Sequence, residues 1–238
     1  THLNFAFMDA DANGDLITTD TWADYQNPNV GYSVGSDNKY AGVLGAMVLL
    51  RQKYPNMKIG ISVGGWTRSG DFPKLAASDK TRKNFANNVA KFVHCYGYDF
   101  VDIDWEYPTA SSANQFTSFM RYLREGLTKR GLTLSSAVAA TSGTYQTDEV
   151  LNMVDWINVM AYDGDSGAGH SPYSLLTNSF NYWDSTRKVD ASKIVLGVPF
   201  YERPNWASYA DVVANNSANA YKDSAVINGT TVYYNGLD

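Results

Sequence analysis

Three acidic residues occupy alternate positions in YDFVDIDWEYP, which runs from Tyr98 to Pro108. On a β-strand, residues two apart share one face, so Asp102, Asp104 and Glu106 would lie on the same side, about 6 to 7 Å from one to the next. Crowded carboxyl groups cannot all ionise at low cost, and at least one keeps its proton to a higher pH. This pattern favours general acid catalysis near neutral pH.

Two other interpretations of this acidic row are the solvated face of an antiparallel strand and a site for a hard cation. The first fits poorly, because a strand that alternates with helices is covered on both faces, here by Val101, Ile103 and Trp105 on the side opposite the acids. Glu106 is the best candidate for the proton donor, since it ends the row at the carboxyl end of the strand. Asp104 lies between two acids and can pass a proton or a hydrogen bond between them.

The elements that must position these acids alternate in type. Apolar runs predict six strands, at 2–7, 58–65, 100–106, 132–140, 156–162 and 193–200. Helical spacing fills much of the sequence between them, and such alternation predicts βαβ units with parallel strands. The first strand is not followed by GxGxxG, which argues against an open doubly wound sheet. We therefore predict an α/β fold, the (β/α)8 TIM barrel.

The predicted barrel accounts for the whole chain as one domain, residues 1–238. Six strands fall short of the eight that a barrel needs, so we expect the first and last strands to be missing from this sequence. Residues 205–238 predict an insertion or a hairpin-containing loop before the last strand. A monomer is expected if the barrel is complete.

Composition excludes several classes of function. The formal net charge is -5, 18% of the residues are charged, and there is no Lys/Arg run that would bind nucleic acid or an anionic membrane. No apolar stretch approaches the roughly 20 residues that span a bilayer. Cys95 is the single cysteine, which rules out an internal disulfide and a thiolate metal site. We expect a neutral or weakly polar ligand and no metal or other cofactor.

Two motifs match known functional patterns without the context these need. DADANGDLITTD, residues 9–20, matches a calcium-binding loop but follows a strand rather than a helix, so a turn is the preferred interpretation. GYSVG at 31–35 matches a serine nucleophile motif but has no strand directly before it or helix directly after it. The histidines, including His170 after a Gly-rich loop, give a serine hydrolase no support.

Four motifs follow one another at strand ends: SVGG at 62–65, DFVDIDWE at 99–106, MAYD at 160–163 and VPFYER at 198–203. In this order they resemble the motifs of glycoside hydrolase family 18, the chitinases and their relatives. DFVDIDWE fits the family's DxxDxDxE signature in all four acidic positions. The resemblance implies a secreted chitinase that degrades an extracellular polysaccharide.

The resemblance also implies a substrate-assisted retaining mechanism, in which the acetamido carbonyl of the substrate attacks the anomeric carbon. Glu106 then resembles the acid and later base. Asp104 resembles the residue that orients the acetamido group and stabilises the oxazolinium ion, with Asp102 as its partner. Tyr162 would donate a hydrogen bond to the acetamido oxygen, and Asp163 would contact the same sugar.

Further residues are assigned to the substrate cleft by the same comparison. Ser62 would support Asp102, while Asp99 is expected to be structural. The expected lining residues are Met160, Tyr201 and Arg203, with Trp66 and Tyr107 as residues that stack on sugars or belong to the core.

The expected reaction is hydrolysis of β-1,4 links in chitin or N-acetylglucosamine oligosaccharides. Two alternatives remain open. An endo-β-N-acetylglucosaminidase acting on N-glycans shares the same acids, and the loops decide between the two enzymes. A chitinase-like lectin binds glycans without cutting them, although relatives of that kind have typically lost the terminal acid, which is present here as Glu106.

Overall fold

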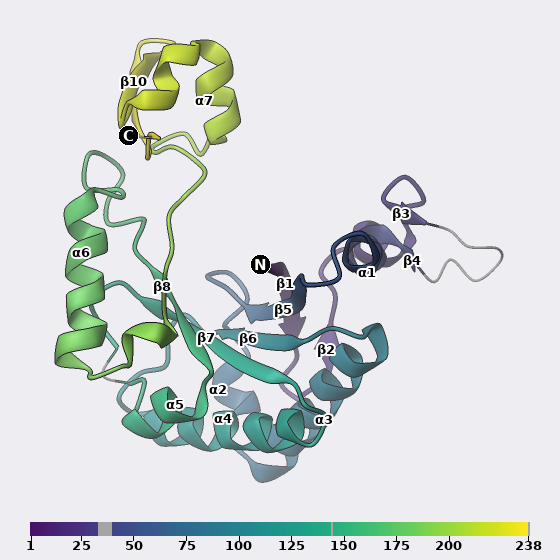
Figure 1. Ribbon diagram of the computed structural model, residues 1–238. Helices are drawn as coiled ribbons and strands as arrows, with labels where there is room; N and C mark the ends of the chain where they lie inside the picture. The colour runs from purple at the N-terminus through teal and green to yellow at the C-terminus, as the bar shows by residue number, and fades with distance from the viewer. Residues whose placement is uncertain (33–39, 144, 238) are drawn as a thin grey trace. The chain divides into compact units, whose positions relative to one another are not determined.

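The computed structural model describes residues 1–32, 40–143 and 145–237 (Figure 1). The chain divides into two compact units. The first unit comprises Thr1–Ala137 with Thr144–Trp156, and the second comprises Val138–Gly143 with Ile157–Asp238. Each unit is described by itself.

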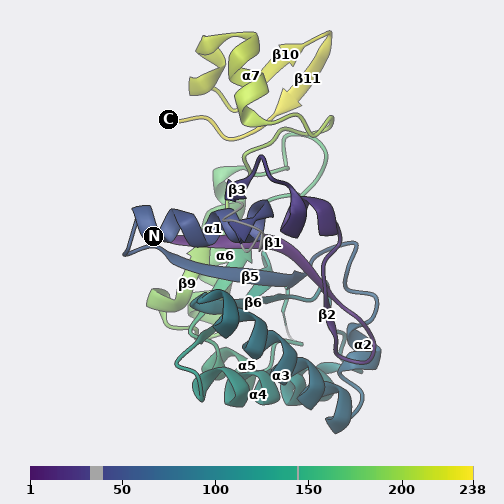
Figure 2. The same ribbon diagram turned by 90° about the vertical axis from the view of Figure 1, so that its right-hand side faces the viewer.

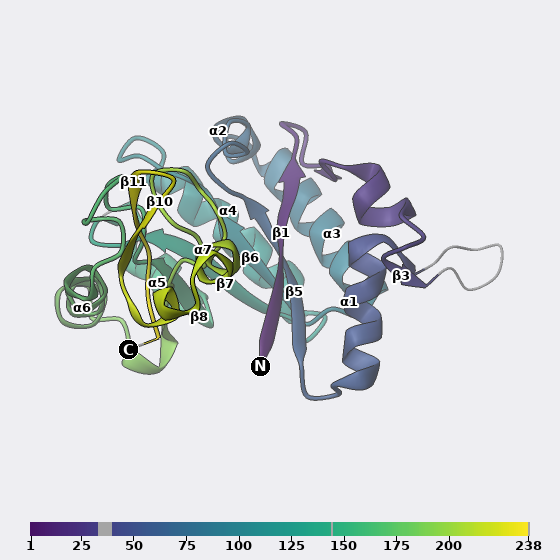
Figure 3. The same ribbon diagram turned by 90° about the horizontal axis from the view of Figure 1, so that it is seen from above.

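A mainly parallel sheet forms the centre of the first unit. Its strands lie in the order β2-β1-β5-β6-β7, and the first two pair antiparallel while the others pair parallel. Figure 3 shows β1 and β5 side by side. The bounds are β1 His2–Ala10, β2 Leu16–Ile17, β5 Lys58–Gly64, β6 Phe100–Asp104 and β7 Thr133–Ala139.

Helices cover this sheet, and their ends follow from local sequence. They are α1 Gly42–Lys53, α2 Phe72–Leu75, α3 Asp79–Tyr96, α4 Ala113–Thr128 and α5 Asp148–Met153. The short elements η1 Trp22–Gln26, β3 Gly31–Tyr32 and β4 Tyr40–Ala41 precede α1. Helix α3 begins after Ser78, whose side chain accepts a hydrogen bond from Thr81 N, and ends at Gly97 with a φ of 67°.

Helices α3 and α4 lie side by side and supply the aromatic core under β6 (Figure 2). Phe85 of α3 stacks on Phe119 of α4 with 5.2 Å between ring centroids. Trp105, directly after β6, stacks on Phe72 at 5.2 Å and meets Phe116 edge-on at 5.5 Å. Burial of each such side chain stabilises the fold by about 1.5 to 3 kcal/mol. The face of β6 opposite the acids is thus packed against the helices.

The second unit contains a parallel pair of strands and a separate small core. Strands β8 Trp156–Met160 and β9 Ile194–Leu196 pair parallel, and α6 Tyr173–Asn181, η3 Tyr182–Thr186 and η4 Ala191–Lys193 lie between them in the sequence. After β9 come α7 Tyr209–Asn215, η5 Ser217–Tyr221, β10 Ser224–Ile227 and β11 Thr230–Tyr233. The fully buried Trp183 anchors the first part, because its Nε1 donates to Ala139 O at 3.1 Å.

A hairpin of β10 and β11 packs on α7 through a small apolar core. Val212, Val232 and Tyr234 are buried there. The hairpin turns at Asn228 and Gly229, whose φ values of 50° and 79° match the type I′ turn that Asn-Gly favours. An antiparallel bridge between Arg203 and Tyr233 joins the hairpin to the segment after β9. The hairpin expected within residues 205–238 is therefore present, and its status as an insertion stays a prediction.

All six predicted strands are present, and five end earlier than predicted, three of them by two residues or more. Strand β6 ends at Asp104, so the prediction that Glu106 closes the strand was wrong. Glu106 N donates to the side chain of Ser69 at 2.8 Å rather than to a neighbouring strand, so the strand pairing stops before it. Strands β8 and β9 are likewise shorter than the predicted 156–162 and 193–200.

Within residues 9–20, the segment 11–15 forms a turn between β1 and β2 that satisfies its own amides. Asp11 Oδ1 accepts from Asn13 N at 2.9 Å and from Asp15 N at 2.8 Å. Asn84 of α3 donates to Asn13 O at 2.8 Å and anchors the loop. Within the described residues, no group of three or more His, Cys, Asp or Glu side chains is placed to hold a metal ion.

Of the GYSVG motif, residues 31–32 form β3 and residues 33–35 lie outside the described residues. None of the helices in the described parts of the chain has the length and apolar character needed to span a membrane.

Candidate active site

The register of the parallel sheet surrounds Asp102 with two serines. Ser62 of β5 and Ser135 of β7 lie opposite Asp102 of β6. Ser62 Oγ donates to Asp102 Oδ2 at 2.7 Å, and Ser135 Oγ donates to Oδ1 at 2.6 Å. All three side chains are buried, and two donors compensate the carboxylate for its lost hydration. Asp102 is therefore held in one orientation at the start of the row.

Asp104 is the acid with the most strongly perturbed proton affinity. Its side chain is 5% exposed, and Oδ1 is buried with no hydrogen-bond partner. Burial, followed by the charges of Glu106 and Asp102, raises its pKa from 3.8 to about 8. Near neutral pH this carboxyl group therefore keeps a proton, as expected where acids crowd together.

Glu106 follows the strand in a loop held by Ser69 and Gly65. Ser69 Oγ accepts from Glu106 N at 2.8 Å and donates to Gly65 O at 2.9 Å. Gly65 N donates in turn to Asp104 O at 2.7 Å. At Gly64, with φ of 114°, a Cβ would come within 2.2 Å of Asp104 O. The absence of a side chain at Gly64 thus allows the end of β5 to approach Asp104 closely.

Two aromatic residues of this unit, Trp66 and Tyr107, follow the SVGG and DFVDIDWE motifs directly in the sequence. Tyr107 hydrogen-bonds to Glu106, and burial, the negative charge of Glu106 and this hydrogen bond raise the pKa of its phenol. Its ring centroid lies 6.0 Å from that of Tyr145. Trp66, one residue beyond SVGG, is 74% exposed. Trp66 is therefore not a core residue of the first unit, whereas Tyr107 is a partner of Glu106.

Asp99, the first acid of the DxxDxDxE pattern, has a structural role, as predicted. Its Oδ2 accepts from Arg51 Nη1 at 2.6 Å and from Ile59 N at 2.9 Å, and Lys58 lies 3.5 Å from Oδ1. These contacts join α1, β5 and the start of β6. Asp99 is thus tied to the end of the sheet opposite Glu106.

A second cluster forms around Asp163 in the second unit. Tyr201 donates to Asp163 Oδ2 at 2.7 Å, and Arg203 Nη1 lies 3.4 Å from Oδ1. The buried His170 Nδ1 lies 3.2 Å from both the backbone N and the carboxylate Oδ1 of Asp163. Burial lowers the pKa of His170 despite the neighbouring Asp163 carboxylate. The cluster therefore presents one carboxylate to several donors and a neutral histidine.

Tyr201 connects this cluster to other aromatic rings. Burial and the hydrogen bond to Asp163 raise the pKa of its phenol, so it remains a donor at neutral pH. Tyr162 meets the Tyr201 ring edge-on, with 6.5 Å between centroids. Gly197 of the segment after β9 allows this arrangement, because a Cβ there would lie 2.8 Å from Tyr162. Met160, the last residue of β8, is half-buried.

The predicted site residues thus gather into two sets, one in each unit. The first unit holds Ser62, Trp66, Asp102, Asp104, Glu106 and Tyr107, and the second holds Met160, Tyr162, Asp163, Tyr201 and Arg203. Sequence reasoning missed Ser69, Ser135 and His170. A signal existed for Ser135, because LTLSSAVAA places two adjacent serines in an apolar run that reads as a buried strand.

Comparison with known proteins places the chain in a family. The family model described as "Glycosyl hydrolases family 18" matches residues 1–234. "Chitinase 1" of Aphanocladium album is 34% identical over 85% of this chain and 55% of the relative. "Chitinase A1" of Niallia circulans is 32% identical over 80% of this chain and 33% of the relative. The chain spans about half the length of the first of these relatives.

Solved structures agree with the sequence comparison. The family 18 chitinase ChiB of Flavobacterium johnsoniae matches with a TM-score of 0.79 and 26% identity, over 99% of this chain and 73% of the other. Chitinase ChiA74 of Bacillus thuringiensis matches with a TM-score of 0.74 and 29% identity, over 85% and 44%. The predicted α/β fold of the TIM-barrel type is confirmed, and the chain belongs to glycoside hydrolase family 18.

Proposed function

We propose that this protein hydrolyses β-1,4 links between N-acetylglucosamine units of chitin or its oligosaccharides by a substrate-assisted retaining mechanism. Family membership and relatives named as chitinases support the substrate class. The observation that carries the proposal is the state of Asp104, a buried carboxyl with a pKa raised to about 8 between two other acids.

Glu106 is the proposed acid and base. It lies beyond the end of β6 in a loop fixed by Ser69, so its position relative to Asp104 is set by the backbone. It gives a proton to the glycosidic oxygen while the acetamido carbonyl of the substrate attacks the anomeric carbon. The same residue then accepts a proton from the water that opens the oxazolinium ion.

Asp104 orients the acetamido group and stabilises the positive charge. A buried oxygen without a protein partner, such as Oδ1, is costly unless a ligand supplies the partner, which supports a substrate contact. As the oxazolinium ion forms, its positive charge favours ionised Asp104 over the neutral form. Asp102, fixed by Ser62 and Ser135, is the neighbouring acid that can take the released proton.

The second cluster is proposed to bind rather than to transfer protons. Tyr162 would donate a hydrogen bond to the acetamido oxygen, and Asp163 would contact the same sugar. Tyr201 and Arg203 hold the Asp163 carboxylate in place. Met160, Trp66 and Tyr107 are proposed to complete the cleft lining.

The decisive experiment incubates the whole protein with chitohexaose and, separately, with a high-mannose glycopeptide, and resolves products by length and anomer. Chitohexaose cleavage with the β-anomer formed first is the expected result. The α-anomer as first product would exclude the substrate-assisted mechanism. Cleavage of the glycopeptide alone would assign the protein as an endo-β-N-acetylglucosaminidase, and binding without cleavage would assign it as a lectin.

Three organisational proposals accompany this function. Because chitin is an insoluble extracellular polymer, we propose that the protein acts outside the cell. We also propose that residues 1–238 belong to one catalytic domain and that residues 205–238 are an insertion in its barrel. Gel filtration with light scattering tests the further expectation of a monomer, which a stable dimer would overturn.

A further inference from the structure

An exposed tryptophan lies beside the Asp163 cluster. The Trp206 side chain is 58% exposed, although it contacts two other side chains. Its ring stacks on Tyr201 with 5.3 Å between centroids and 27° between planes. The guanidinium carbon of Arg203 lies 3.9 Å from the Trp206 ring centroid. These contacts fix the indole while leaving most of it open to solvent.

Both neighbours of Trp206 also hold Asp163. Tyr201 donates to the Asp163 carboxylate at 2.7 Å, and Arg203 approaches it at 3.4 Å. The same two side chains therefore bind a proposed sugar-contacting acid and the exposed indole. Trp206 is thus part of this cluster, and not an isolated aromatic residue on the surface.

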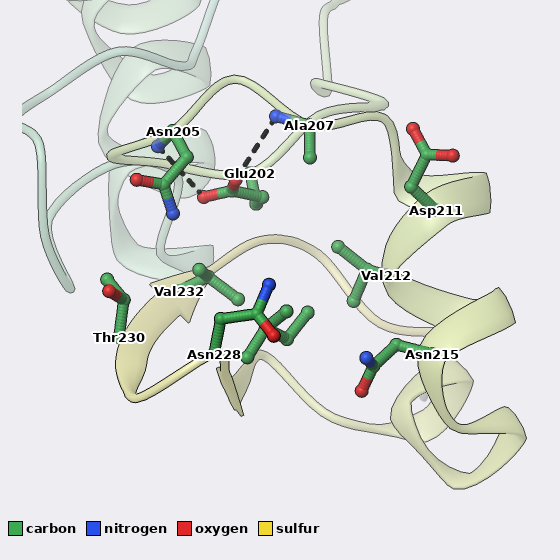
Figure 4. Close-up of a pocket in the computed structure, with 10 residues that line it drawn as sticks. Glu202, Asn205, Ala207, Asp211, Val212, Asn215, Asn228, Thr230 and Val232 are labelled. Atoms are coloured by element: carbon green, nitrogen blue, oxygen red, sulfur yellow. Dashed lines mark hydrogen bonds between the residues drawn. The ribbon is translucent and has the colours of Figure 1, made fainter.

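A buried carboxylate holds the loop that carries Trp206. Glu202 is 1% exposed, and its two oxygens accept from Asn205 N at 3.2 Å and from Ala207 N at 3.1 Å. Figure 4 shows both bonds at the edge of a cavity of about 330 Å³. Trp206 N donates to Glu202 O at 3.1 Å, so every amide from Asn205 to Ala207 is bound to Glu202.

The backbone at Trp206 is in a conformation that bulky residues avoid. Its φ is 67°, in the left-handed region. Such conformations persist only where the surroundings impose them, and they occur frequently at ligand-binding sites. The Glu202 bonds provide that constraint here. The loop thus keeps an unfavourable backbone geometry that presents an indole to solvent.

We propose that Trp206 is a platform on which one pyranose ring of the substrate stacks, and that Glu202 is the positioning residue that holds the platform. The proposal rests on the proposed function. In β-1,4-linked N-acetylglucosamine the ring substituents are equatorial, so each ring offers a flat face of axial C–H groups. An indole held rigid by Tyr201 and Arg203 matches such a face without losing side-chain entropy on binding.

The platform is tested by steady-state kinetics of the whole protein with chitohexaose. Trp206→Gly should raise KM about tenfold and change kcat less than about twofold, because stacking is uniform binding. Glycine accepts the positive φ, so the backbone of the loop is kept, and any fall in the thermal midpoint reports the lost contacts with Tyr201 and Arg203. Trp206→Phe should recover most of the lost affinity. An unchanged KM in Trp206→Gly would overturn the proposal.

The positioning role of Glu202 is tested by a double-mutant cycle. Glu202→Gln retains one acceptor oxygen and should raise KM severalfold in the wild-type background. In the Trp206→Gly background the same substitution should have no further effect, because the group it positions is gone. Equal effects in both backgrounds would show that Glu202 acts elsewhere.

Calorimetric binding of chitohexaose to the same variants separates this inference from the proposed function. If the wild-type protein binds the hexamer but does not cleave it, the proposed hydrolysis is wrong. The affinity of Trp206→Gly for the hexamer then still tests the platform. If the wild-type protein cleaves the hexamer and Trp206→Gly binds it equally well, only the platform fails.

Discussion

The two clusters of predicted site residues surround their carboxyl groups with opposite kinds of neighbour. In the first unit Asp102, Asp104 and Glu106 face one another, and the pKa of Asp104 rises to about 8 as a result of burial and these neighbouring charges. In the second unit a single carboxylate, that of Asp163, faces a phenol and a guanidinium. Crowded acids retain protons, whereas donors around a single carboxylate fix its orientation. The first arrangement suits proton transfer, and the second suits binding.

The substitution with the largest expected effect separates proton transfer from binding. Glu106→Gln keeps the size of the side chain but removes the transferable proton, so turnover of chitohexaose should fall by about a thousandfold or more. Binding of the hexamer, measured by calorimetry, should change less than about threefold, because the proposed binding cluster around Asp163 is intact. Glu125→Gln, an exposed position on α4, is the matched control. Near wild-type hydrolysis by Glu106→Gln would contradict the assignment.

The proton held by Asp104 should also make the free energy of unfolding depend on pH. Between about pH 4 and pH 8 the folded state keeps a proton that the unfolded carboxyl, with an ordinary pKa of 3.8, has lost. Stability should therefore fall as pH rises through this window, by at most about 1.4 kcal/mol per pH unit. Asp104→Asn removes this dependence, and its stability relative to the wild type should increase steadily toward pH 8.

Urea unfolding at several pH values from 4.5 to 9 measures this difference. Asp71→Asn, which alters an exposed carboxylate paired with Lys74, is the matched control for the substitution itself. Parallel curves for the wild type and Asp104→Asn would mean that the carboxyl is ionised in the folded protein, and the contrast between the two clusters would then disappear.

How far the sequence predicted these clusters depends on how local their contacts are. Alternation within one strand predicted that Asp102 and Asp104 share a face, and the position of Asp99 before the strand predicted its structural role. The six strands were found because each is a short apolar run between helices. The early end of β6 was missed, since it depends on Ser69, which lies 37 positions before Glu106 in the sequence.

The contacts of the second cluster were harder to predict from the sequence, because they also join residues that lie far apart in the chain. Tyr201 and Arg203 lie 38 and 40 positions from Asp163, so local spacing could not show that they meet. They were assigned to the cleft only by resemblance. His170, only seven positions from Asp163, was missed because a Gly-rich loop has no periodicity that fixes side-chain direction. Ser135 likewise depends on the register between β6 and β7.

The smallest expected effect tests whether the second cluster acts on binding alone. Tyr201→Phe removes the donor to Asp163 Oδ2 but keeps the ring that stacks on Trp206. One hydrogen bond to a partly exposed carboxylate is worth about 1 kcal/mol, so KM for chitohexaose should rise about fivefold. Because no proton donor of the acidic row is altered, kcat and its pH profile should stay unchanged.

The control for this substitution is Tyr173→Phe, an exposed tyrosine at the start of α6. A shifted pH profile in Tyr201→Phe would show that Asp163 and its donors take part in proton transfer, which would remove the distinction between the two clusters. A higher KM with an unchanged profile would assign proton transfer to the first unit and orientation of the sugar to the second. Tyr201→Phe and its control thereby test the division of roles without altering the acidic row of the first unit.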